Sequence, residues 1–426
     1  MLDINMVREN PELVKASEKK RNRDPALVDE VLSIDAEWRK SLRKVEDLKH
    51  QRNVVSEEIN TAKKAKNNSL AEEKIKKMRS VVDDIKRLEQ EVEQLLTARN
   101  EKLALLGNIL QKEVPVGKDA QDNKVIKKWG KITKSTFELQ NHAELLEKLG
   151  YADFDAGISN AGQGFNYLKG DTALLDLALQ RYGVDFLLKN GFAPVTPPLM
   201  LNYKTLLGAL NGLKDFQDVV YKIENEDLYL IGTAEHSLVA SLKNKIISEK
   251  ELPIKLFAVT PCFRKEIGGH GIDMKWLYRM HQFNKVEQVV FSAPEQSGKM
   301  LKYMQGLTEK FFQSLGIPYR VLEICSGDLG LKFARQWDIE AWFPRQKEYR
   351  EVTSAGTCTD FQANALNIKY VKDGEKKSVH ILNNTMVATS RAMVAILENF
   401  QTKKGTVKIP KVLWPYMNGV REMGKK

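Results

Sequence analysis

The stretch FRKEIGGHGIDMKWLYRMHQFNKVEQVVF, Phe263–Phe291, carries many charged residues on a frame of phenylalanine, leucine and valine. It follows an apolar run, LFAVT (Leu256–Thr260), and ends in another, VEQVVF. Two strands joined by a polar loop fit this layout. The stretch therefore predicts a hairpin with charges gathered near its open end.

Alternate residues of a strand share a face, so one face of this hairpin carries a particular set of groups. Arg264 is expected to lie beside Glu266, and on the returning strand His281 lies beside Phe283, with Glu287 farther along. Arginine grips phosphate with a planar fork, and an aromatic ring can stack on a base. The face suits a nucleotide together with an ammonium group.

Further strands are expected around this hairpin, because short apolar runs recur between turn residues. They are FNYLKG (165–170), the run ending at Pro197–Pro198, DVVYKI (218–223), LYLIGT (228–233), YRVLEI (319–324), DIEAWFP (338–344), YREVTSAGTCTDFQA (349–363) and SVHILNN (378–384). Short connections predict a mixed, mainly antiparallel sheet flanked by helices, which is an α+β fold. Helices are expected over Asn141–Gly150, Thr172–Lys189 and Thr389–Gln401, and Arg391 near the start of the last suits a phosphate. No GxGxxG or GxxxxGK[ST] motif appears, so the fold is not a Rossmann fold.

The first part of the chain has a different character, since it contains almost no glycine or proline before Pro115. Apolar residues recur three and four apart, first in Trp38, Leu42, Val45, Val55, Ile59 and Ala62, and then in Ile75, Met78, Val82, Ile85, Val92 and Leu95. The polar break Lys64–Glu73 separates the two stripes. Two such stripes predict an antiparallel coiled coil, with helices of roughly 30 residues reaching about 45 Å. We therefore expect an N-terminal helical arm in residues 1–113 and a second domain in residues 114–426.

Basic residues crowd the turn of this arm: Lys63, Lys64, Lys66, Lys74, Lys76, Lys77 and Arg79. Only Glu72 and Glu73 oppose them there. A solvated helix surface is the plain explanation. Because the bases gather at the tip of a long lever, contact with the phosphates of a nucleic acid is the favoured interpretation.

Composition supports a polyanionic partner and a reducing compartment. The chain has 426 residues, a formal net charge of +11 and a pI near 9.2. Cys262, Cys325 and Cys358 are odd in number and far apart, which argues against a disulfide framework or a CxxC metal site. No targeting segment and no long apolar run is visible, so the cytoplasm is the expected location.

From Ala161 to Tyr416 the chain resembles the catalytic core of class II aminoacyl-tRNA synthetases, and specifically the seryl-tRNA synthetase family. FAPVTPP (192–198), PCFRKE with RMHQFNKVE (261–266 and 279–287) and LNNTMVATSRAMVAILENF (382–400) resemble motifs 1, 2 and 3. The marks TAE (233–235), HQFNKVE (281–287) and EVTSAGTCTDFQA (351–363) are similar to those of the seryl family, and the two-helix arm extends the match. NNTxxATSR and TAEH look more archaeal than bacterial.

The resemblance implies an ATP-dependent ligase that forms seryl-adenylate and pyrophosphate, then transfers serine to tRNA(Ser), with tRNA(Sec) as a further acceptor to consider. Arg264 would hold the α-phosphate and Arg391 the γ-phosphate, while Phe283 and Arg391 would enclose the adenine. Glu351 and Ser354 would bind Mg²⁺, and no zinc is expected. Motif 1 implies a homodimer, in which the arm of one subunit reaches tRNA bound at the other.

Carried over residue by residue, the resemblance gives three sets. The catalytic set is Arg264, Glu351 and Arg391. The ATP-binding set is Arg264, Lys265, Glu266, Met280, His281, Gln282, Phe283, Glu351, Val352, Thr353, Ser354 and Arg391. The serine-binding set is Thr233, Ala234, Glu235, Glu287, Asn383 and Thr385.

Plainer roles stay open for several of these residues. Glu235 and Glu287 could instead form structural ion pairs with lysines, and His281 could serve to hold the motif 2 loop. Thr353 and Thr359 could be ordinary strand residues. Cys325 and Cys358 are expected to be core thiols.

The chain also departs from the family pattern. The motif 2 loop reads GIDMKW (Gly271–Trp276), in which Ile272 and Met274 replace a basic residue and a threonine, and Asn364 stands where an arginine is common. The loop typically guides the tRNA acceptor end, so transfer is less secure than adenylation. An amino acid ligase that charges a carrier protein and a non-catalytic binding paralogue stay open as alternatives, although the arm and the complete phosphate-binding set disfavour them.

Overall fold

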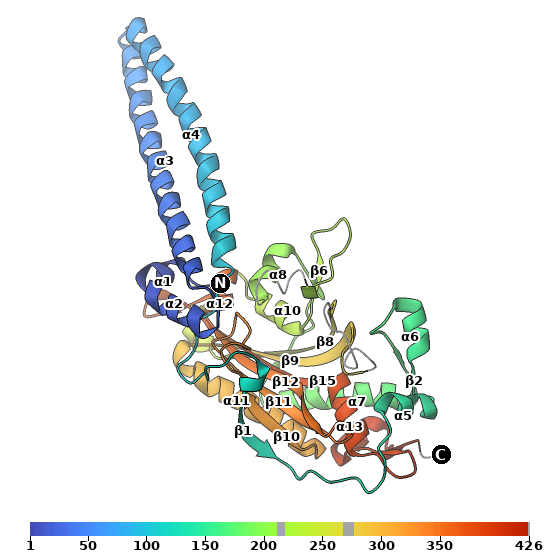
Figure 1. Ribbon diagram of the computed structural model, residues 1–426. Coiled ribbons are helices and arrows are strands. Elements are labelled where there is room, and N and C mark those ends of the chain that lie inside the picture. The colour runs from blue at the N-terminus through green and yellow to red at the C-terminus, as the bar shows by residue number, and fades with distance from the viewer. Residues whose placement is uncertain (211–217, 267–276, 425–426) are drawn as a thin grey trace. The chain divides into compact units, whose positions relative to one another are not determined.

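The computed structural model describes residues 1–210, 218–266 and 277–424 (Figure 1). The chain divides into two compact units. One contains Met1, Lys20–Asn22 and Gly107–Lys426, and the other contains Leu2–Lys19 and Arg23–Leu106. The motif 2 loop departures at Gly271–Trp276 lie outside the described residues. Among the described residues, no helix is both long enough and apolar enough to cross a membrane.

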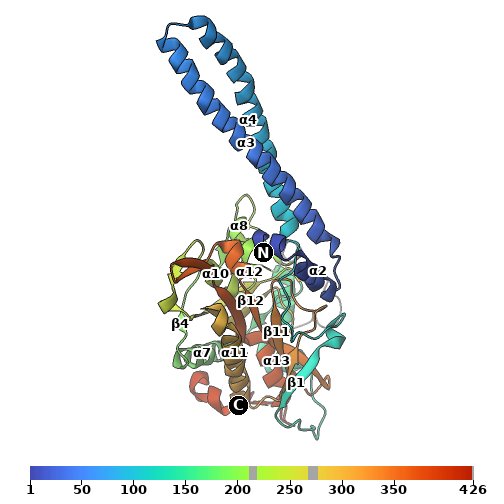
Figure 2. The same cartoon turned by 90° about the vertical axis from the view of Figure 1, so that its left-hand side faces the viewer.

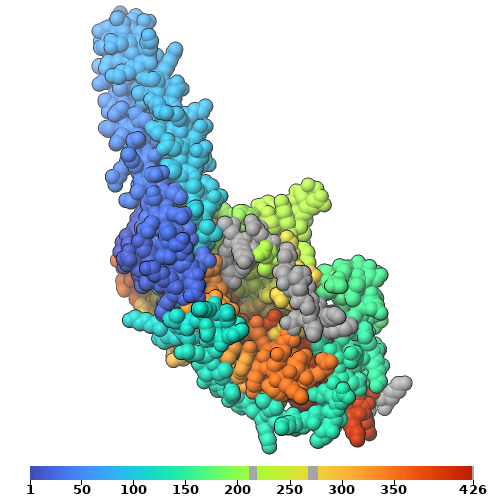
Figure 3. Space-filling view, in the orientation of Figure 1, coloured from blue at the N-terminus to red at the C-terminus, as the bar shows by residue number. Residues whose placement is uncertain are grey.

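The N-terminal unit is dominated by an antiparallel pair of helices, α3 (Ala26–Lys64) and α4 (Asn68–Leu103), preceded by α1 (Ile4–Glu9) and α2 (Pro11–Lys20). In both views α3 and α4 lie side by side (Figure 2), and in the space-filling view they form a narrow rod (Figure 3). The predicted coiled coil is confirmed. The helices are longer than expected, because 39 residues of α3 at 1.5 Å each span about 58 Å.

The apolar residues between α3 and α4 differ from the expected set near the turn that joins the two helices. Val45, Ala62 and Ile85 are buried as predicted, but Val82 is 46% exposed, so its assignment to the seam was wrong. Val82 lines an open gap between the helices. The small Ala62, in the last turn of α3, and Ala71, in the first turn of α4, are buried. The polar break is also shorter than Lys64–Glu73, since Asn67 accepts a hydrogen bond from the backbone of Leu70 and caps α4.

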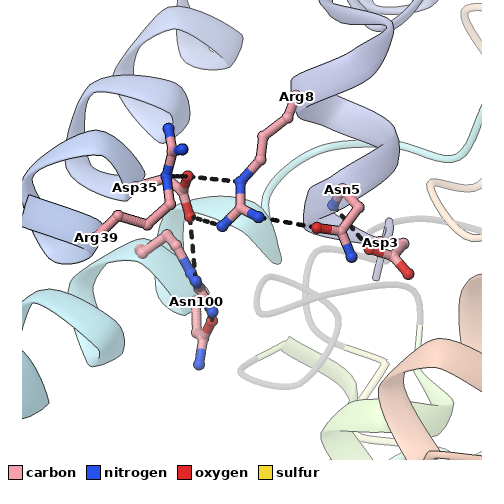
Figure 4. A network of polar contacts seen from close by, with 7 residues as sticks. Asp3, Asn5, Arg8, Asp35, Arg39 and Asn100 are labelled. Atoms are coloured by element: carbon pink, nitrogen blue, oxygen red, sulfur yellow. Dashed lines mark hydrogen bonds and ion pairs between the residues drawn. The ribbon is translucent and has the colours of Figure 1, made fainter. Parts of the chain in front are cut away.

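The base of the helix pair is fastened by one buried carboxylate, Asp35, on which Arg8 and Arg39 converge (Figure 4). Arg8 Nη2 lies 2.6 Å from Asp35 Oδ1, and Arg99 Nη1 lies 3.2 Å from the same oxygen. Burial opposes the charge on Asp35, but the hydrogen bonds and charges of these arginines hold its pKa below the usual range. The carboxylate joins α1, α3 and α4.

We expect Asp35→Asn to destabilise the N-terminal unit by about 3 kcal/mol, because removing one partner of a buried ion pair leaves the others uncompensated. The lowered pKa means that Asp35 contributes its stability above the unfolded pKa of about 4 and loses it as the pH falls through the lower folded value. The difference between wild type and variant should therefore be full at neutral pH and shrink in acid. Urea unfolding followed by helical circular dichroism measures it, with the exposed Asp47→Asn on the same helix as control. Equal midpoints for Asp35→Asn and wild type at neutral pH would contradict this role.

The second unit is built on an eight-stranded sheet of order β1-β10-β11-β12-β15-β9-β8-β4. The strands are β1 (Lys124–Trp129), β4 (Ala193–Pro194), β8 (Ile254–Phe263), β9 (Gln282–Ser292), β10 (Tyr319–Glu323), β11 (Arg335–Phe343), β12 (Glu348–Thr359) and β15 (His380–Ala388). All pairs are antiparallel except β4 with β8. The predicted α+β fold with a mainly antiparallel sheet is confirmed, and β8 and β9 form the expected hairpin.

Helices pack on both faces of this sheet. Apolar residues alternate along β9, so Val286 and Val290 join one core and Val289 and Phe291 the other. The larger core includes α7 (Gly170–Lys189), α11 (Pro294–Leu315) and α13 (Thr389–Asn399), and the smaller includes α8 (Tyr203–Ala209), α10 (Ala234–Ala240) and α12 (Phe361–Leu366). Further short elements are α5 (His142–Leu149), α6 (Phe154–Ala161), β2 (Ala152–Asp153), β3 (Tyr167–Leu168), β5 (Met200–Leu201), β6 (Tyr229–Leu230), β7 (Ile246–Ser248), β13 (Lys369–Lys372), β14 (Glu375–Ser378), β16 (Val407–Lys408) and β17 (Glu422–Met423).

Several expected strands are shorter or absent. Residues 218–223 form no strand, only an isolated bridge between Lys222 and Tyr229. The end of YREVTSAGTCTDFQA turns into α12, because Phe361 begins a helix after Thr359 leaves β12. The run before Pro197–Pro198 pairs only at Ala193–Pro194, at the sheet edge where proline is tolerated. Cys325 and Cys358 are buried free thiols, as predicted.

Candidate active site

A cavity of about 390 Å³ opens in the second unit beside the β8–β9 hairpin. Its lining comes from that hairpin, from β12 and β15, and from the first turns of α10 and α13. Polar and charged side chains predominate on its wall. Strands fix the direction of the side chains from β9, β11, β12 and β15, while the segments 278–280 and 328–333 add further groups to the wall.

Arg264, which directly follows β8, is held in place from two sides. Arg264 Nε donates to the carbonyl oxygen of Gly232 at 3.1 Å, and the guanidinium lies 5.3 Å from the centre of the Phe283 ring. The hairpin brings Arg264 and Phe283 to one site, as the sequence predicted, but Arg264 directly follows β8 and His281, expected on the same face, does not line the cavity. The remaining N–H groups of the guanidinium suit an anionic group in the cavity.

A second arginine reaches the cavity from the start of α13. Arg391 Nη1 lies 2.8 Å from Glu351 Oε1, and the guanidinium lies 4.9 Å from the centre of the Tyr278 ring. Burial opposes its charge, but Glu351 and Tyr278 raise the pKa of Arg391 above its usual value. Tyr278 in turn donates to the backbone oxygen of Glu351 at 2.9 Å. The arginine is therefore a fixed, permanently charged group.

Side chains with oxygen atoms that could bind a cation lie on β11 and β12, close to Glu351. Gln336 Nε2 donates at 3.0 Å both to Ser354 Oγ and to Asp338 Oδ1. Burial, with the nearby charge of Glu351, raises the pKa of Asp338 to about 8. Within the described part of the chain no group of three or more His, Cys, Asp or Glu side chains is placed to hold a metal ion. Glu351 and Ser354 line the cavity with oxygen atoms of the kind that Mg²⁺ takes as ligands.

Two buried carboxylates, Glu235 and Glu287, also line the cavity. Glu235 Oε1 lies 2.5 Å from Lys332 Nζ and accepts a bond from Gln362 at 2.7 Å, while Asn383 donates to its other oxygen. Burial opposes ionisation, but the charge of Lys332 holds the pKa of Glu235 below its usual range. His236 beside it is neutral at pH 7, because burial lowers its pKa to about 3.

Glu287, on β9, has similar surroundings. Its Oε2 lies 2.6 Å from Lys285 Nζ and accepts a bond from Thr385 Oγ1 at 3.1 Å. Burial raises the pKa of Glu287, against the opposing charge of Lys285. Both carboxylates thus form the lysine ion pairs that the sequence left open as an alternative. Both also lie on the cavity wall, so pairing and ligand contact are compatible.

His281 joins three segments outside the cavity. Its Nδ1 lies 2.8 Å from the hydroxyl of Tyr221 and 2.9 Å from the carbonyl oxygen of Arg264, and its ring stacks on Phe165. A β-carbon at Gly164 would fall 2.5 Å from this ring, so the position needs glycine. The geometry supports the structural alternative for His281.

The structure brings most of the expected ATP and serine residues to the cavity wall: Thr233, Glu235, Arg264, Glu266, Met280, Phe283, Glu287, Glu351, Val352, Thr353, Ser354, Asn383, Thr385 and Arg391. It does not bring Ala234, Lys265, His281 or Gln282 there. Ala234 is buried in α10, the backbone N–H of Lys265 bonds to Val219, and Gln282 is exposed at the start of β9.

Sequence reasoning missed several lining residues, among them Tyr278, Lys285, Gln336 and Lys332. Lys285 could have been found, because it is two residues before Glu287 and so shares its face. Lys332 lies between β10 and β11, and no local pattern indicates where its side chain points.

At the turn of the arm, all the predicted basic residues are exposed except Lys74, which is half-buried. Lys74 Nζ lies 2.6 Å from Glu58 Oε2, so an acidic residue beyond Glu72 and Glu73 also opposes the bases there. The other basic residues are exposed, which leaves them accessible to a polyanion.

Comparison with known proteins gives consistent results over the whole length. Residues 1–110 match the model of the seryl-tRNA synthetase N-terminal domain, and residues 219–400 match the model of the class II tRNA synthetase core domain for G, H, P, S and T. The serine--tRNA ligase of Methanocella arvoryzae is 48% identical over 99% of both chains.

Solved structures agree with these matches. The seryl-tRNA synthetase of Pyrococcus horikoshii complexed with ATP has a TM-score of 0.90 and 44% identity, with 99% of each chain covered. The cytoplasmic serine-tRNA ligase of Naegleria fowleri in complex with AMP has a TM-score of 0.85 and 36% identity, covering 99% of this chain and 98% of that one.

Proposed function

The chain belongs to the serine--tRNA ligase family, and from that membership and the cavity we propose that it activates L-serine with ATP and transfers the serine to tRNA(Ser). The observation that carries the proposal is one cavity whose wall carries both two fixed arginines, Arg264 and Arg391, and two buried carboxylates, Glu235 and Glu287. Serine-dependent exchange of pyrophosphate into ATP, followed by charging of tRNA, tests the two steps in turn. Charging of tRNA(Sec) is a further assay.

The adenylation step requires no side-chain nucleophile, because the carboxylate of serine attacks the α-phosphorus of ATP. Arg264 would neutralise the α-phosphate and Arg391 the γ-phosphate, while Phe283 and Arg391 would enclose the adenine. Both arginines are held by neighbours before any ligand arrives, so little reorganisation is needed when charge develops. Glu351 and Ser354 would hold Mg²⁺, which supplies charge neutralisation between the phosphates when bound.

The residues around Glu235 and Glu287 supply partners for the ammonium and the hydroxyl of serine. Glu235 and Glu287 attract the ammonium, and Thr233 lies beside Glu235 at the start of α10. Asn383 Oδ1 is buried without a hydrogen-bond partner among the described residues, so it is available as an acceptor. Thr385 and Glu287 would bind the hydroxyl. A buried polar group left unpaired is costly, so a substrate without the hydroxyl would be disfavoured.

We expect pyrophosphate exchange with serine to exceed exchange with alanine or glycine by at least about 10⁴-fold in kcat/KM, because a site built to bond a hydroxyl rejects analogues that lack it. Threonine carries the hydroxyl but adds a methyl group, and should also be disfavoured. Parallel assays with the four amino acids measure the ratios. Equal activity with alanine would remove the hydroxyl-binding assignment, and preference for another amino acid would remove the function itself.

The proposal includes the partners and the location. The arm, residues 1–113, would bind tRNA through Lys63, Lys64, Lys66, Lys74, Lys76, Lys77 and Arg79, and residues 114–426 would form the catalytic domain. The match to the N-terminal domain model and the helix pair support tRNA rather than a carrier protein as the acceptor. Translation takes place in the cytoplasm, which is where we place the protein.

A homodimer is also part of the proposal. The short strand β4 lies at the edge of the large sheet, where its outer side is available for pairing. On α7, Leu177 is 60% exposed and Leu188 is 44% exposed, although both are large apolar residues. A second copy of the chain that packs against α7 and the motif 1 segment, residues 192–198, would bury both leucines.

A further inference from the structure

Lys332 is a buried cation that nothing in the motifs of the chain indicates. Its side chain is only 6% exposed, and its Nζ lies 2.5 Å from Glu235 Oε1. Gln362 donates to the same oxygen, and Asn383 donates to the other. Three donors from three separate segments therefore fix one carboxylate on the wall of the cavity.

The turn that carries Lys332, residues 329–333, is itself held by a buried arginine. Arg21 donates to the carbonyl oxygens of Leu329 at 3.1 Å and Phe333 at 2.6 Å, and also to Asn108 at 3.0 Å. Arg21 is 4% exposed and belongs to the same compact unit as the turn. Guanidinium donors in a fixed fork suit several carbonyl oxygens at once.

Asn108 completes this support. Its backbone N–H donates to the carbonyl oxygen of Leu331 at 2.7 Å, and its side-chain amide donates to that of Lys332 at 2.9 Å. The same amide bonds to the carbonyl oxygen of Cys358 on β12 at 2.8 Å. The backbone of Lys332 is therefore tied to the sheet, and the direction of its side chain follows.

Stability alone is a weak explanation for the Lys332–Glu235 pair. Taking two charges out of water is costly, and well-packed apolar residues in place of a buried ion pair are often at least as stable. The pair does not lie in an apolar core, because both residues line the cavity that would receive the substrate. A role toward the substrate accounts better for this position.

We propose that Lys332 is a positioning residue for serine binding, which keeps the Glu235 carboxylate ionised and correctly oriented, and that Arg21 and Asn108 hold the turn from which it acts. This inference rests on the proposed function of the cavity. Lys332 balances the charge of Glu235 before the substrate arrives, so the serine ammonium meets a carboxylate of fixed geometry. Among the described residues, the titratable groups that interact with Glu235 are Lys332, His236, Glu287 and Cys358, and Lys332 is the cation among these four.

Without Lys332, burial would raise the pKa of Glu235, because the largest opposing charge would be gone. The serine ammonium binds the ionised carboxylate. The KM for serine of a Lys332→Met variant should therefore rise as the pH falls through this raised pKa, and should recover as the pH increases. In the wild type the pKa of Glu235 lies low, so this dependence should be missing near neutral pH.

We expect Lys332→Met to raise the KM for serine in pyrophosphate exchange about 10- to 100-fold at neutral pH, the range for loss of a hydrogen bond to a charged group. The KM for ATP should change less than about two-fold. Lys372→Met is the matched control, since Lys372 forms exposed ion pairs with Glu249 and Glu295 away from the cavity. Arg21→Met should raise the KM for serine with the same pH dependence.

A double variant separates this role from a structural one. If Lys332 acts through the charge of Glu235, then Lys332→Met should have no further effect on the KM for serine in a Glu235→Gln background, and the pH dependence should vanish. Since Glu235→Gln with Lys332→Met removes both charges, this protein should fold even if Lys332→Met alone does not. If Lys332→Met alone does not fold, Arg21→Met is measured in its place.

The outcomes are distinguishable. An unchanged KM for serine in Lys332→Met, an equal effect in both backgrounds, or a similar rise in the KM for ATP would overturn the proposal. Normal serine and ATP kinetics in Arg21→Met would overturn the role of the turn. If the wild-type protein showed no serine-dependent exchange at all, the proposed function would fail instead.

Discussion

Replacing Arg264 by alanine is expected to slow serine-dependent pyrophosphate exchange by about 10²–10³-fold, the loss that follows removal of one preorganised donor at a developing charge. The structure holds this guanidinium between the carbonyl oxygen of Gly232 and the Phe283 ring, so it is in place before ATP binds. Since the arginine would stabilise the transition state more than the bound substrates, kcat should fall more than the KM values rise.

Arg320→Ala is a suitable control for this measurement. Like Arg264, Arg320 lies over an aromatic ring, Tyr349, and it pairs with the carboxylate of Glu340, but it does not line the cavity. Its loss should leave exchange close to wild type. If Arg264→Ala folded normally and exchanged pyrophosphate at the wild-type rate, the assignment of the β8–β9 hairpin to ATP would be wrong.

Deleting Val45–Leu95 and closing the gap with a short glycine-serine linker should abolish most tRNA charging and spare pyrophosphate exchange. The deletion keeps Asp35, Arg39 and Arg99, which fasten the base of α3 and α4. The cavity lies wholly in the other compact unit, so adenylation does not require the removed residues. Charging should fall through weaker tRNA binding, seen as a large rise in the KM for tRNA.

A companion variant tests whether the charges of the tip matter. Lys63, Lys64, Lys66, Lys76 and Lys77 are exposed, whereas Lys74 pairs with Glu58 and is left unchanged. Replacing the exposed lysines by glutamine should flatten the plot of log tRNA affinity against log salt, because each phosphate contact releases counterions. Exchange should stay at the wild-type rate. If the plots for wild type and the lysine variant coincided, these lysines would be only a solvated surface. If the Val45–Leu95 deletion lost pyrophosphate exchange, the arm would be needed for adenylation.

Much of the fold could be predicted from the sequence, because helices and strands follow from the spacing of apolar residues within short segments. Apolar spacing of three and four predicted α3 and α4, and alternating runs predicted β8, β9, β10, β11 and β15. Two local predictions were wrong. The β-like run at 218–223 pairs only through Lys222, and Val82 lies beside an open gap instead of within the seam.

The sequence by itself determined the coiled coil and the antiparallel sheet, because spacing along a helix or strand fixes which side chains share a face. The motif residues Arg264, Glu351 and Arg391 were predicted from the resemblance to the family. Only the tertiary structure showed that Lys332 meets Glu235, and that Arg21 supports Lys332 from more than 300 residues away in sequence. Such contacts depend on how loops from distant segments converge. Loop side chains have no period that fixes their direction, so the burial and pairing of charges emerge only when the whole domain has closed around them.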